Sequence, residues 1–447
     1  MEVILGYDAG AAAKGKVTPV IYNTKELLNA HALFMGKSGS GKTYTLREII
    51  TQMAAQAKKD GKEFRCHIMD VHGDIEIDDA STVKFSEATN YGFNPLIINP
   101  DPDFGGVRKK IESFVRNINR AGRQLGDKQA ATLRNILYDL YEANYFFADD
   151  PLSWKLKDPR YPNYNKRMPN LSDALRFAKS KATSLYLGTS SKAVSKLEQI
   201  NKKKSILYNK LKQKNKTTNP VDLGDLEAQI DKLCDELLEL NTEYLKSIKT
   251  GQELSEIFKY TSLDTLNSVV ERLENLNSCG IFRNELPPFD PNKAIWRYDI
   301  KALSQEEKKL FVSFLLEAIF YVATQRGPRD DVVEIVILDE AHLFITEDDD
   351  NPVNVIAREA RKFGLGLFAA SQSPEHFSTD FLSNVSAKVI LGIDESFWNA
   401  TSKKLRVDMK ALEWMVHHEK ILIQLNKKGQ NKNQFIWTLK KKPTVRS

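Results

Sequence analysis

The stretch Gly36-Lys37-Ser38-Gly39-Ser40-Gly41-Lys42-Thr43 decides the fold, because it fits the pattern GxxxxGK[ST] and no other stretch of the chain does. The residues before it, 31–36, form a short apolar run that predicts a strand. From Lys42 the pattern becomes helical, and one face is apolar: Leu46, Ile49, Ile50, Met53 and Ala54. A glycine-rich loop between a strand and an amphipathic helix indicates a phosphate-binding loop. The alternative is a glycine-rich turn with a structural role.

The chemistry of such a loop gives each kind of residue in it a role. Its glycines let successive backbone N–H groups turn inward around a phosphate, and the helix N-terminus adds positive potential. We expect Lys42 to reach the β- and γ-phosphate oxygens and the Thr43 hydroxyl to bind Mg²⁺. The predicted nucleotide-binding residues are Gly36, Lys37, Ser38, Gly39, Ser40, Gly41, Lys42, Thr43 and Tyr44.

A second apolar run, 332–338, predicts a buried strand that is followed by two acidic residues, Asp339 and Glu340. A nucleotide hydrolase needs carboxylates at the end of a strand near its phosphate loop. We therefore expect Asp339 to hold Mg²⁺, and Glu340 to act with Lys42 in catalysis by polarising the attacking water. The alternative is a solvated strand end. Because a small-molecule kinase would not need Glu340 placed this way, hydrolysis is favoured over phosphoryl transfer to a metabolite.

Two further groups of polar residues are candidates for the catalytic site. Gln372 follows the predicted strand 365–370, where its amide could sense the γ-phosphate or hold the water, unless it belongs to an ordinary polar loop. Arg358, Arg361 and Lys362 share a face of a short predicted helix. They form either a solvated face or the source of an arginine finger for a neighbouring subunit, with Arg361 placed ahead of Arg358.

The segment Asp70-Val71-His72-Gly73-Asp74 follows another predicted strand, 64–69, and so opens on the same side of the sheet as the phosphate loop. His72 has a carboxylate two positions away on each side. It could touch the magnesium shell or couple the nucleotide to a partner; the alternative is an ordinary turn histidine. The other histidines show no metal-ligand spacing, so we expect no zinc site.

Strand and helix patterns on both sides of a long helical segment predict one doubly wound α/β core with an insertion. Further strands are expected at 387–393, 420–425 and 434–439, and Ser304 with Glu307 forms a capping box that begins a helix. The predicted division places the first part of the core in residues 1–110 and the helical insertion in residues 111–285. The second part of the core, with its basic tail, is predicted in residues 286–447.

Within the insertion, residues of about 192–248 predict an antiparallel coiled-coil hairpin with complementary charge. The arm Lys192–Lys216 carries nine Lys and one Glu, whereas Asp222–Glu243 carries eight acidic residues and one Lys. Thr217–Pro220 supplies the turn. Apolar residues recur at heptad-like spacing in both arms: Leu197, Ile200, Leu207 and Leu211, then Leu226, Ile230, Leu233, Leu237, Leu240 and Tyr244. The alternative is two helices packed into the main body.

Composition limits the environment and the partners. The three cysteines are widely spaced and show no metal-ligand pattern, which predicts buried thiols in a reducing compartment. The net charge of +6 is too mild to indicate nucleic acid, but Ser402–Ser447 alone sums to +9, as either a DNA-facing surface or a solvated tail. Because no stretch is apolar enough to span a membrane and no leader pattern occurs, we expect a cytoplasmic protein with no membrane partner.

The ordered set of motifs resembles the HerA branch of the HerA/FtsK superfamily. The resemblance covers about residues 20–110 and 285–440 and leaves the helical middle outside it. The motifs that carry it are Leu27–Gly36, Asp70–Asp74, Phe93–Leu96, Leu338–His342, Arg358–Gly364 and Ser371–Pro374.

This resemblance implies a RecA-like ATPase that forms a hexameric ring, passes duplex DNA through its channel and works with a nuclease or another effector. It implies ATP and Mg²⁺ as ligands and matches the residues above to family positions: Lys42 and Thr43 to the phosphate loop, Asp339 and Glu340 to the magnesium and catalytic carboxylates, Gln372 to the sensor, and Arg358 or Arg361 to the trans finger. Typical members carry an N-terminal β-barrel that docks the nuclease. Here about thirty residues precede the first strand of the loop, so we expect no such barrel.

Three functions follow from these expectations. The first is an ATP-driven DNA translocase, a homohexamer that serves a nuclease-containing repair or phage-defence complex and holds DNA through its phosphates. The second is a nucleotide-controlled ring that assembles an effector protein with little DNA movement. The third is a protein-transfer ATPase related to secretion motors, which the sequence favours least because it predicts no membrane anchor.

Overall fold

The computed structural model describes residues 1–158, 160, 166–187, 191–215, 220–247, 259–260, 262–430 and 434–443. The chain forms two compact units. The sheet unit comprises Met1–Phe93, Arg120–Gly122 and the described part of Arg283–Ser447, and the helical unit comprises Asn94–Asn119 and the described part of Arg123–Phe282. Because packing alone defines these units, the predicted domain boundaries stay predictions.

The sheet unit is built on a sheet that has eleven strands among the described residues, in the order β2-β1-β11-β10-β9-β3-β8-β7-β4-β6-β5. From β9 to β5 all neighbouring strands are parallel, whereas β2, β1, β11 and β10 extend the sheet by antiparallel pairing. The strands are β1 (Glu2–Asp8), β2 (Pro19–Asn23), β3 (Ala32–Gly36), β4 (Arg65–Asp70), β5 (Ala80–Lys84), β6 (Ile295–Asp299), β7 (Glu334–Leu338), β8 (Leu365–Ser371), β9 (Ala387–Gly392), β10 (Lys420–Leu425) and β11 (Ile436–Leu439).

The strands predicted from apolar runs are confirmed to within two residues at each end, and β10 and β11 pair antiparallel. Four strands were not predicted: β1, β2, β5 and β6. In β5, Val83 alone is buried, and both β1 and β2 carry exposed positions. Because these strands lie near the two sides of the sheet, they need fewer apolar residues and leave a weaker pattern in the sequence.

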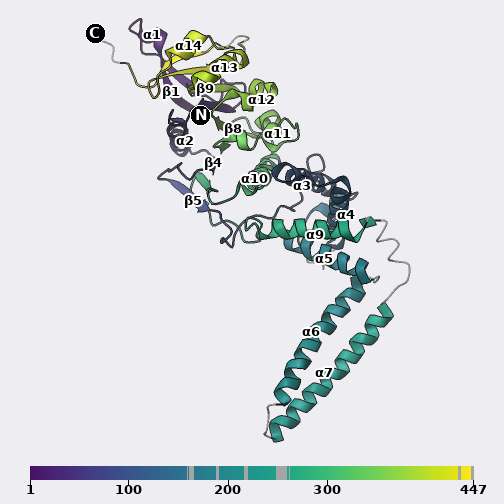
Figure 1. The fold of residues 1–447 in the computed structure, drawn as a ribbon. Helices are drawn as coiled ribbons and strands as arrows, with labels where there is room; N and C mark the ends of the chain where they lie inside the picture. The colour runs from purple at the N-terminus through teal and green to yellow at the C-terminus, as the bar shows by residue number, and fades with distance from the viewer. Residues whose placement is uncertain are drawn as a thin grey trace. The chain divides into compact units, whose positions relative to one another are not determined.

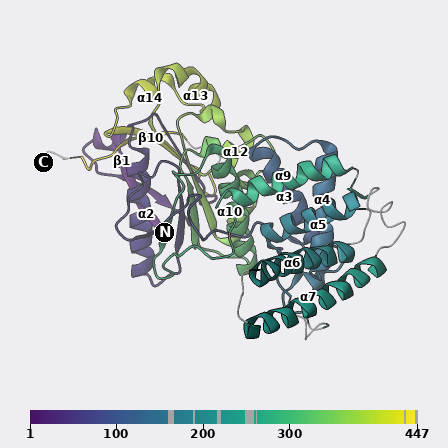
Figure 2. The ribbon, with the colours of Figure 1, turned by 60° about the horizontal axis from the view of Figure 1, so that its bottom comes forward.

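Helices cover both faces of the sheet. Figure 2 shows α2 on one face and α10 on the other. The apolar face predicted for α2 packs on alternate residues of the central strands, including Phe34, Ile68, Ile337 and Phe368. The predicted capping box is confirmed at the start of α10. The helices of this unit are α1 (Ala9–Ala12), α2 (Lys42–Lys59), α10 (Gln305–Arg326), α11 (Pro352–Glu359), α12 (Thr379–Asn384), α13 (Trp398–Leu405) and α14 (Met409–Trp414).

The helical part of the chain contains α3 (Val107–Ala121), α4 (Asp127–Ala143), α5 (Leu171–Leu187), α6 (Ser191–Lys214), α7 (Pro220–Ser247) and α9 (Leu263–Ser278). Helices α6 and α7 lie side by side (Figure 1). Their ion pairs join Lys214 to Glu227 at 2.7 Å, Lys203 to Glu236, and Lys196 to Glu243, so the helices run antiparallel with basic residues facing acidic ones. A coiled coil between them stays a prediction. Of the predicted turn Thr217–Pro220, residues 217–219 lie outside the described residues, and Pro220 is the first residue of α7.

The environment of the cysteines departs from expectation. Cys66 is buried in β4, but Cys234 is exposed on α7 and Cys279 is half-buried. The prediction that all three are buried is therefore wrong for two of them, because Cys234 lies outside the apolar spacing that faces α6. Among the described residues, no helix has both the length and the apolar character needed to cross a lipid bilayer.

Candidate nucleotide site

The predicted phosphate-binding loop lies between β3 and α2, as the sequence requires. Gly39 and Gly41 have φ angles of 76° and 89°, in the left-handed region that favours glycine. The loop is fixed at one end, where the Lys37 N–H donates to the carbonyl oxygen of Gly392 at 2.8 Å, and it turns where the Ser40 N–H donates to the Lys37 carbonyl at 3.1 Å. Strand β9, which ends in Gly392, therefore supports the loop from the side.

Two side chains of the loop hold polar atoms that suit a phosphate. The ammonium group of Lys42 is buried and donates to the Gly36 carbonyl at 2.6 Å and to the Lys37 carbonyl at 3.4 Å. Ser40 is also buried, and its Oγ has no hydrogen-bond partner among the described residues. Lys37, Ser38 and Gly39 are exposed. A compact loop with a buried cation and an unpaired buried hydroxyl fits the triphosphate that the sequence predicts.

The sheet topology brings the distant motifs to one edge. Strands β3, β8, β7 and β4 are parallel neighbours, so their carboxyl ends meet. The phosphate loop, Gln372, the pair Asp339–Glu340 and the segment Asp70–Asp74 follow these four strands in that order. Gln372 is exposed and follows the strand that separates the loop from the two acids. This is the position that a group contacting a γ-phosphate requires.

The pair Asp339–Glu340 is buried directly after β7. Burial raises the pKa of Asp339 to about 7, and the neighbouring charge of Glu340 adds to this effect. Glu340 has backbone angles φ 47° and ψ 50°, a left-handed conformation that is uncommon outside glycine. Its Oε2 has no hydrogen-bond partner among the described residues. A solvated strand end, the alternative interpretation, does not fit carboxylates that are buried to this degree.

The segment after β4 holds a carboxylate that the fold already uses. Asp70 is fully buried, and its oxygens accept from Arg297 Nε at 2.8 Å, from the Gly73 N–H at 2.7 Å and from the Ile75 N–H at 3.0 Å. Asp70, Asp74 and Asp339 nevertheless each offer an oxygen within 4.8 Å of the others. His72 is exposed at the same edge. Oxygen donors of this kind suit Mg²⁺, and with the Asp70 carboxylate tied to Arg297, Asp339 is the better candidate to hold the ion with Thr43.

The arginine cluster lies at the opposite edge of the sheet. Arg358 is in α11, and Arg361 and Lys362 are in the 3₁₀ turn Ala360–Phe363, directly before β8 begins. Strand β8 runs from this turn to the edge that carries Gln372. A strand of seven residues is about 20 Å long. All three side chains are exposed, and Arg358 donates to the Asp349 carbonyl at 2.8 Å. The structure therefore does not bring this cluster to the phosphate loop of the same chain.

The structure adds contacts to the phosphate loop that the sequence did not predict. His418 Nε2 lies 3.0 Å from the carbonyl oxygen of Gly39, and the imidazole packs so closely on Gly41 that a Cβ there would lie 3.0 Å from Nδ1. His418 has a φ of 62°. The neighbouring His417 ring packs in the same way on Gly392. No sequence signal indicated this, because the two histidines form no motif and reach the loop from the far end of the chain.

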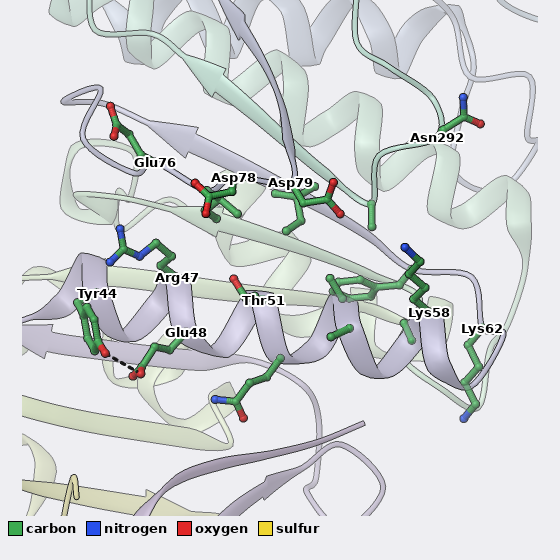
Figure 3. A pocket seen from close by; sticks show the side chains of 18 residues that line it. Tyr44, Arg47, Glu48, Thr51, Lys58, Lys62, Glu76, Asp78, Asp79 and Asn292 are labelled. Atoms are coloured by element: carbon green, nitrogen blue, oxygen red, sulfur yellow. Dashed lines mark hydrogen bonds between the residues drawn. The ribbon is translucent and has the colours of Figure 1, made fainter.

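Tyr44 lies at one end of a groove of about 1020 Å³ that runs along α2 (Figure 3). Its hydroxyl donates to Glu48 at 2.8 Å, and the ammonium group of Lys440 lies 5.4 Å from its ring centroid. Lys440 also bonds Thr45 at 2.5 Å. Part of the basic C-terminal stretch thus packs on the helix of the phosphate loop, whereas residues 444–447 lie outside the described part of the chain.

Comparison with known proteins agrees with this geometry. The family described as the central domain of the helicase HerA matches residues 7–319. The DNA double-strand break repair helicase HerA of Pyrococcus furiosus is 28% identical over 246 residues, which are 46% of this chain and 44% of that protein. A probable HerA of Methanocaldococcus jannaschii is 31% identical over 121 residues, covering 25% and 23%. The match to the first of these relatives thus spans less than half of its length.

Solved structures show the same fold. VirB4 of Thermoanaerobacter pseudethanolicus has a TM-score of 0.61 and 14% identity, with 98% of this chain and 95% of that chain covered. The aligned residues include both the sheet and the helical segment. The predicted fold class, an α/β phosphate-loop core of the RecA type with a mostly helical insertion, is confirmed.

Proposed function

Because this chain belongs to the family of the HerA central domain, we propose that it hydrolyses ATP and uses the energy to move along duplex DNA. One observation carries the proposal: neighbouring parallel strands present a phosphate loop, a polar amide and two buried carboxylates at a single edge. These are the parts that ATP hydrolysis requires. The relative in Pyrococcus furiosus is described as a DNA repair helicase, which supports DNA as the partner.

In the proposed reaction, water attacks the γ-phosphorus of ATP, the bond to the bridging oxygen breaks, and ADP and phosphate leave. Glu340 takes the proton of the water, and Gln372 orients the water or the γ-phosphate. The ammonium group of Lys42 leaves the carbonyl oxygens of the loop and binds phosphate oxygens instead. Its positive charge offsets the negative charge of the γ-phosphate, which the water must approach. Thr43 and Asp339 would hold Mg²⁺, which would neutralise charge on the phosphates when bound.

We further propose that the protein works as a homohexameric ring. Arg361 supports this arrangement, because it is exposed at the edge of the sheet opposite its own phosphate loop. A head-to-tail ring would place this edge of one subunit against the nucleotide edge of the next. Arg361, or Arg358 beside it, would then supply the positive charge that stabilises the transition state in trans. A nuclease or another effector in DNA repair or phage defence is the proposed partner of the ring.

The test is the ATPase rate with and without long duplex DNA, for the wild type and for Glu340→Gln. We expect DNA to stimulate the wild type strongly and the variant to bind ATP without hydrolysing it. Equal wild-type rates with and without DNA would contradict translocation and favour a nucleotide-controlled ring that assembles an effector. Particle size with an ATP analogue tests the ring itself, since a persistent monomer would overturn both forms of the proposal.

A further inference from the structure

The imidazole rings of His342 and His376 stack on each other, and that of His342 lies next to the carboxylate of Glu340. Nδ1 of His342 is 3.2 Å from Oε2 of Glu340. The ring of His342 stacks on the ring of His376, with centroids 4.8 Å apart and planes inclined by 27°. Nδ1 of His376 lies 3.2 Å from the Oγ of Ser371, the last residue of β8. The ends of β7 and β8 are thus joined through side chains as well as through the sheet.

The contact between Glu340 and His342 is incomplete. Neither Oε2 of Glu340 nor Nδ1 of His342 makes a hydrogen bond within the described part of the chain, although both atoms are buried and within hydrogen-bonding distance. Reorientation of either side chain would form the bond without backbone movement. A buried polar pair left unsatisfied costs free energy, and so does the left-handed backbone of Glu340. Such features mark a position that functions in more than one conformation.

We propose that His342 and His376 are positioning residues for Glu340. In one orientation the carboxylate accepts a hydrogen bond from His342, and in the other it turns to the attacking water. The stack on His376 holds the His342 ring, and Ser371 holds His376. Because Ser371 precedes Gln372, a change at the γ-phosphate sensor reaches Glu340 through the two rings.

This inference rests on the proposed function in that it takes Glu340 as the catalytic base. Four variants test it in ATPase assays: His342→Ala, His376→Ala, His376→Phe and, as a matched control, Glu375→Gln, an exposed neighbour of His376. We expect the two alanine variants to lower kcat about tenfold with unchanged ATP affinity, because they misplace the carboxylate without touching the nucleotide. His376→Phe keeps the stack and should stay within about threefold of the wild type.

A second readout does not depend on hydrolysis. The chain has seven histidines, so ¹⁵N labelling of the imidazoles gives few signals, and His342→Gln identifies the signal of His342. Without nucleotide, Glu340→Gln and His376→Ala should shift that signal, and Glu375→Gln should not. An unchanged His342 signal in Glu340→Gln, or equal loss of kcat in His376→Phe and His376→Ala, would overturn the proposal. A wild type without ATPase activity would instead overturn the proposed function, and the imidazole signals would still decide whether the pair contacts Glu340.

Discussion

Strand β7 carries a buried carboxylate at each end, and the two have opposite environments. The carboxylate of Glu334, its first residue, contacts two basic side chains: Nε2 of His67 lies 2.8 Å from its Oε1, and Arg326 forms an ion pair with it. Burial alone would raise the pKa of Glu334, but His67 and Arg326 outweigh burial and lower it. Burial raises the pKa of Asp339, after the last residue, to about 7, and the neighbouring carboxylate of Glu340 adds to this effect.

The difference separates a structural acid from a functional one. Removing a carboxylate that is fully paired leaves its buried partners uncompensated, which destabilises the fold, and such a carboxylate has no free oxygen for chemistry. A carboxylate that is buried beside other carboxylates destabilises the folded state. A bound cation would offset this repulsion and stabilise the folded state. At this strand, the carboxylate at the amino edge of the sheet is paired with basic groups, whereas the carboxylate at the carboxyl edge is not.

The proposed role of Arg361 departs most from this difference between the two edges, because it gives a residue of the amino edge a part in ATP hydrolysis. Arg361→Ala should lower hydrolysis about 10³-fold and leave ATP binding intact, as expected for an arginine finger. Lys362→Ala is the matched control on the same turn. Mixing Arg361→Ala with Glu340→Gln should restore activity, because roughly one interface in four of a randomly mixed ring then has both residues intact. A mixture as inactive as its components would contradict the role in trans.

Glu334→Gln tests the structural end of β7. It removes the partner charge of Arg326 while keeping the size of the side chain, so the free energy of unfolding should fall by about 3 kcal/mol. Urea denaturation measures this change. Glu340→Gln is the control at the other end, and it should leave stability unchanged or raise it, because it removes a charge beside Asp339. Equal losses of stability in the two variants would show that the ends of the strand do not differ.

The sequence predicts those parts of the site that are contiguous in the chain. The phosphate loop needs glycines and Lys42 within eight positions, and the acids must follow an apolar strand, so local patterns suffice. Parallel strands then place both motifs at one edge, which explains why the position of Gln372 could be predicted as well.

Contacts between distant segments leave no such pattern. Arg297 pairs with Asp70 across two neighbouring strands, and nothing in the spacing of either residue indicates that the Asp70 carboxylate is already bonded. His376 stacks on His342 through two separate 3₁₀ turns. The contact of His418 with Gly39 is equally hidden in the sequence, because it joins two segments that lie far apart in the chain.

His31, directly before β3, makes the free energy of unfolding depend on pH through a group at the amino edge of the sheet. Its Nδ1 accepts from the Leu367 N–H at 3.0 Å, and burial, with a smaller contribution from Arg361, lowers its pKa to about 4. The unfolded chain therefore takes up the proton first, and stability that is complete above pH 6.5 is lost as the pH falls toward 4. The loss should reach about 2 kcal/mol at pH 5.

His31→Asn keeps an acceptor for Leu367 and cannot be protonated. Its free energy of unfolding should fall less than that of the wild type between pH 7 and pH 5, as urea titrations at each pH would measure. Because Arg361 contributes to the shift, Arg361→Ala should also flatten the wild-type curve slightly. Parallel curves for the wild type and His31→Asn would rule out His31 as the titrating group.

The smallest expected effect concerns His418 at the carboxyl edge. His418→Gly removes the contact with the Gly39 carbonyl but relieves a backbone with φ of 62°, which glycine adopts without strain. ATP binding should therefore weaken by about 1 kcal/mol, or roughly fivefold, while thermal stability stays equal or rises. His418→Asn is the control, because asparagine tolerates the left-handed region but its side chain is too short to replace Nε2 of His418, so it should weaken ATP binding as much as His418→Gly. If His418→Gly lost stability but bound ATP as tightly as the wild type, His418 would belong with Glu334 among the residues that serve the fold.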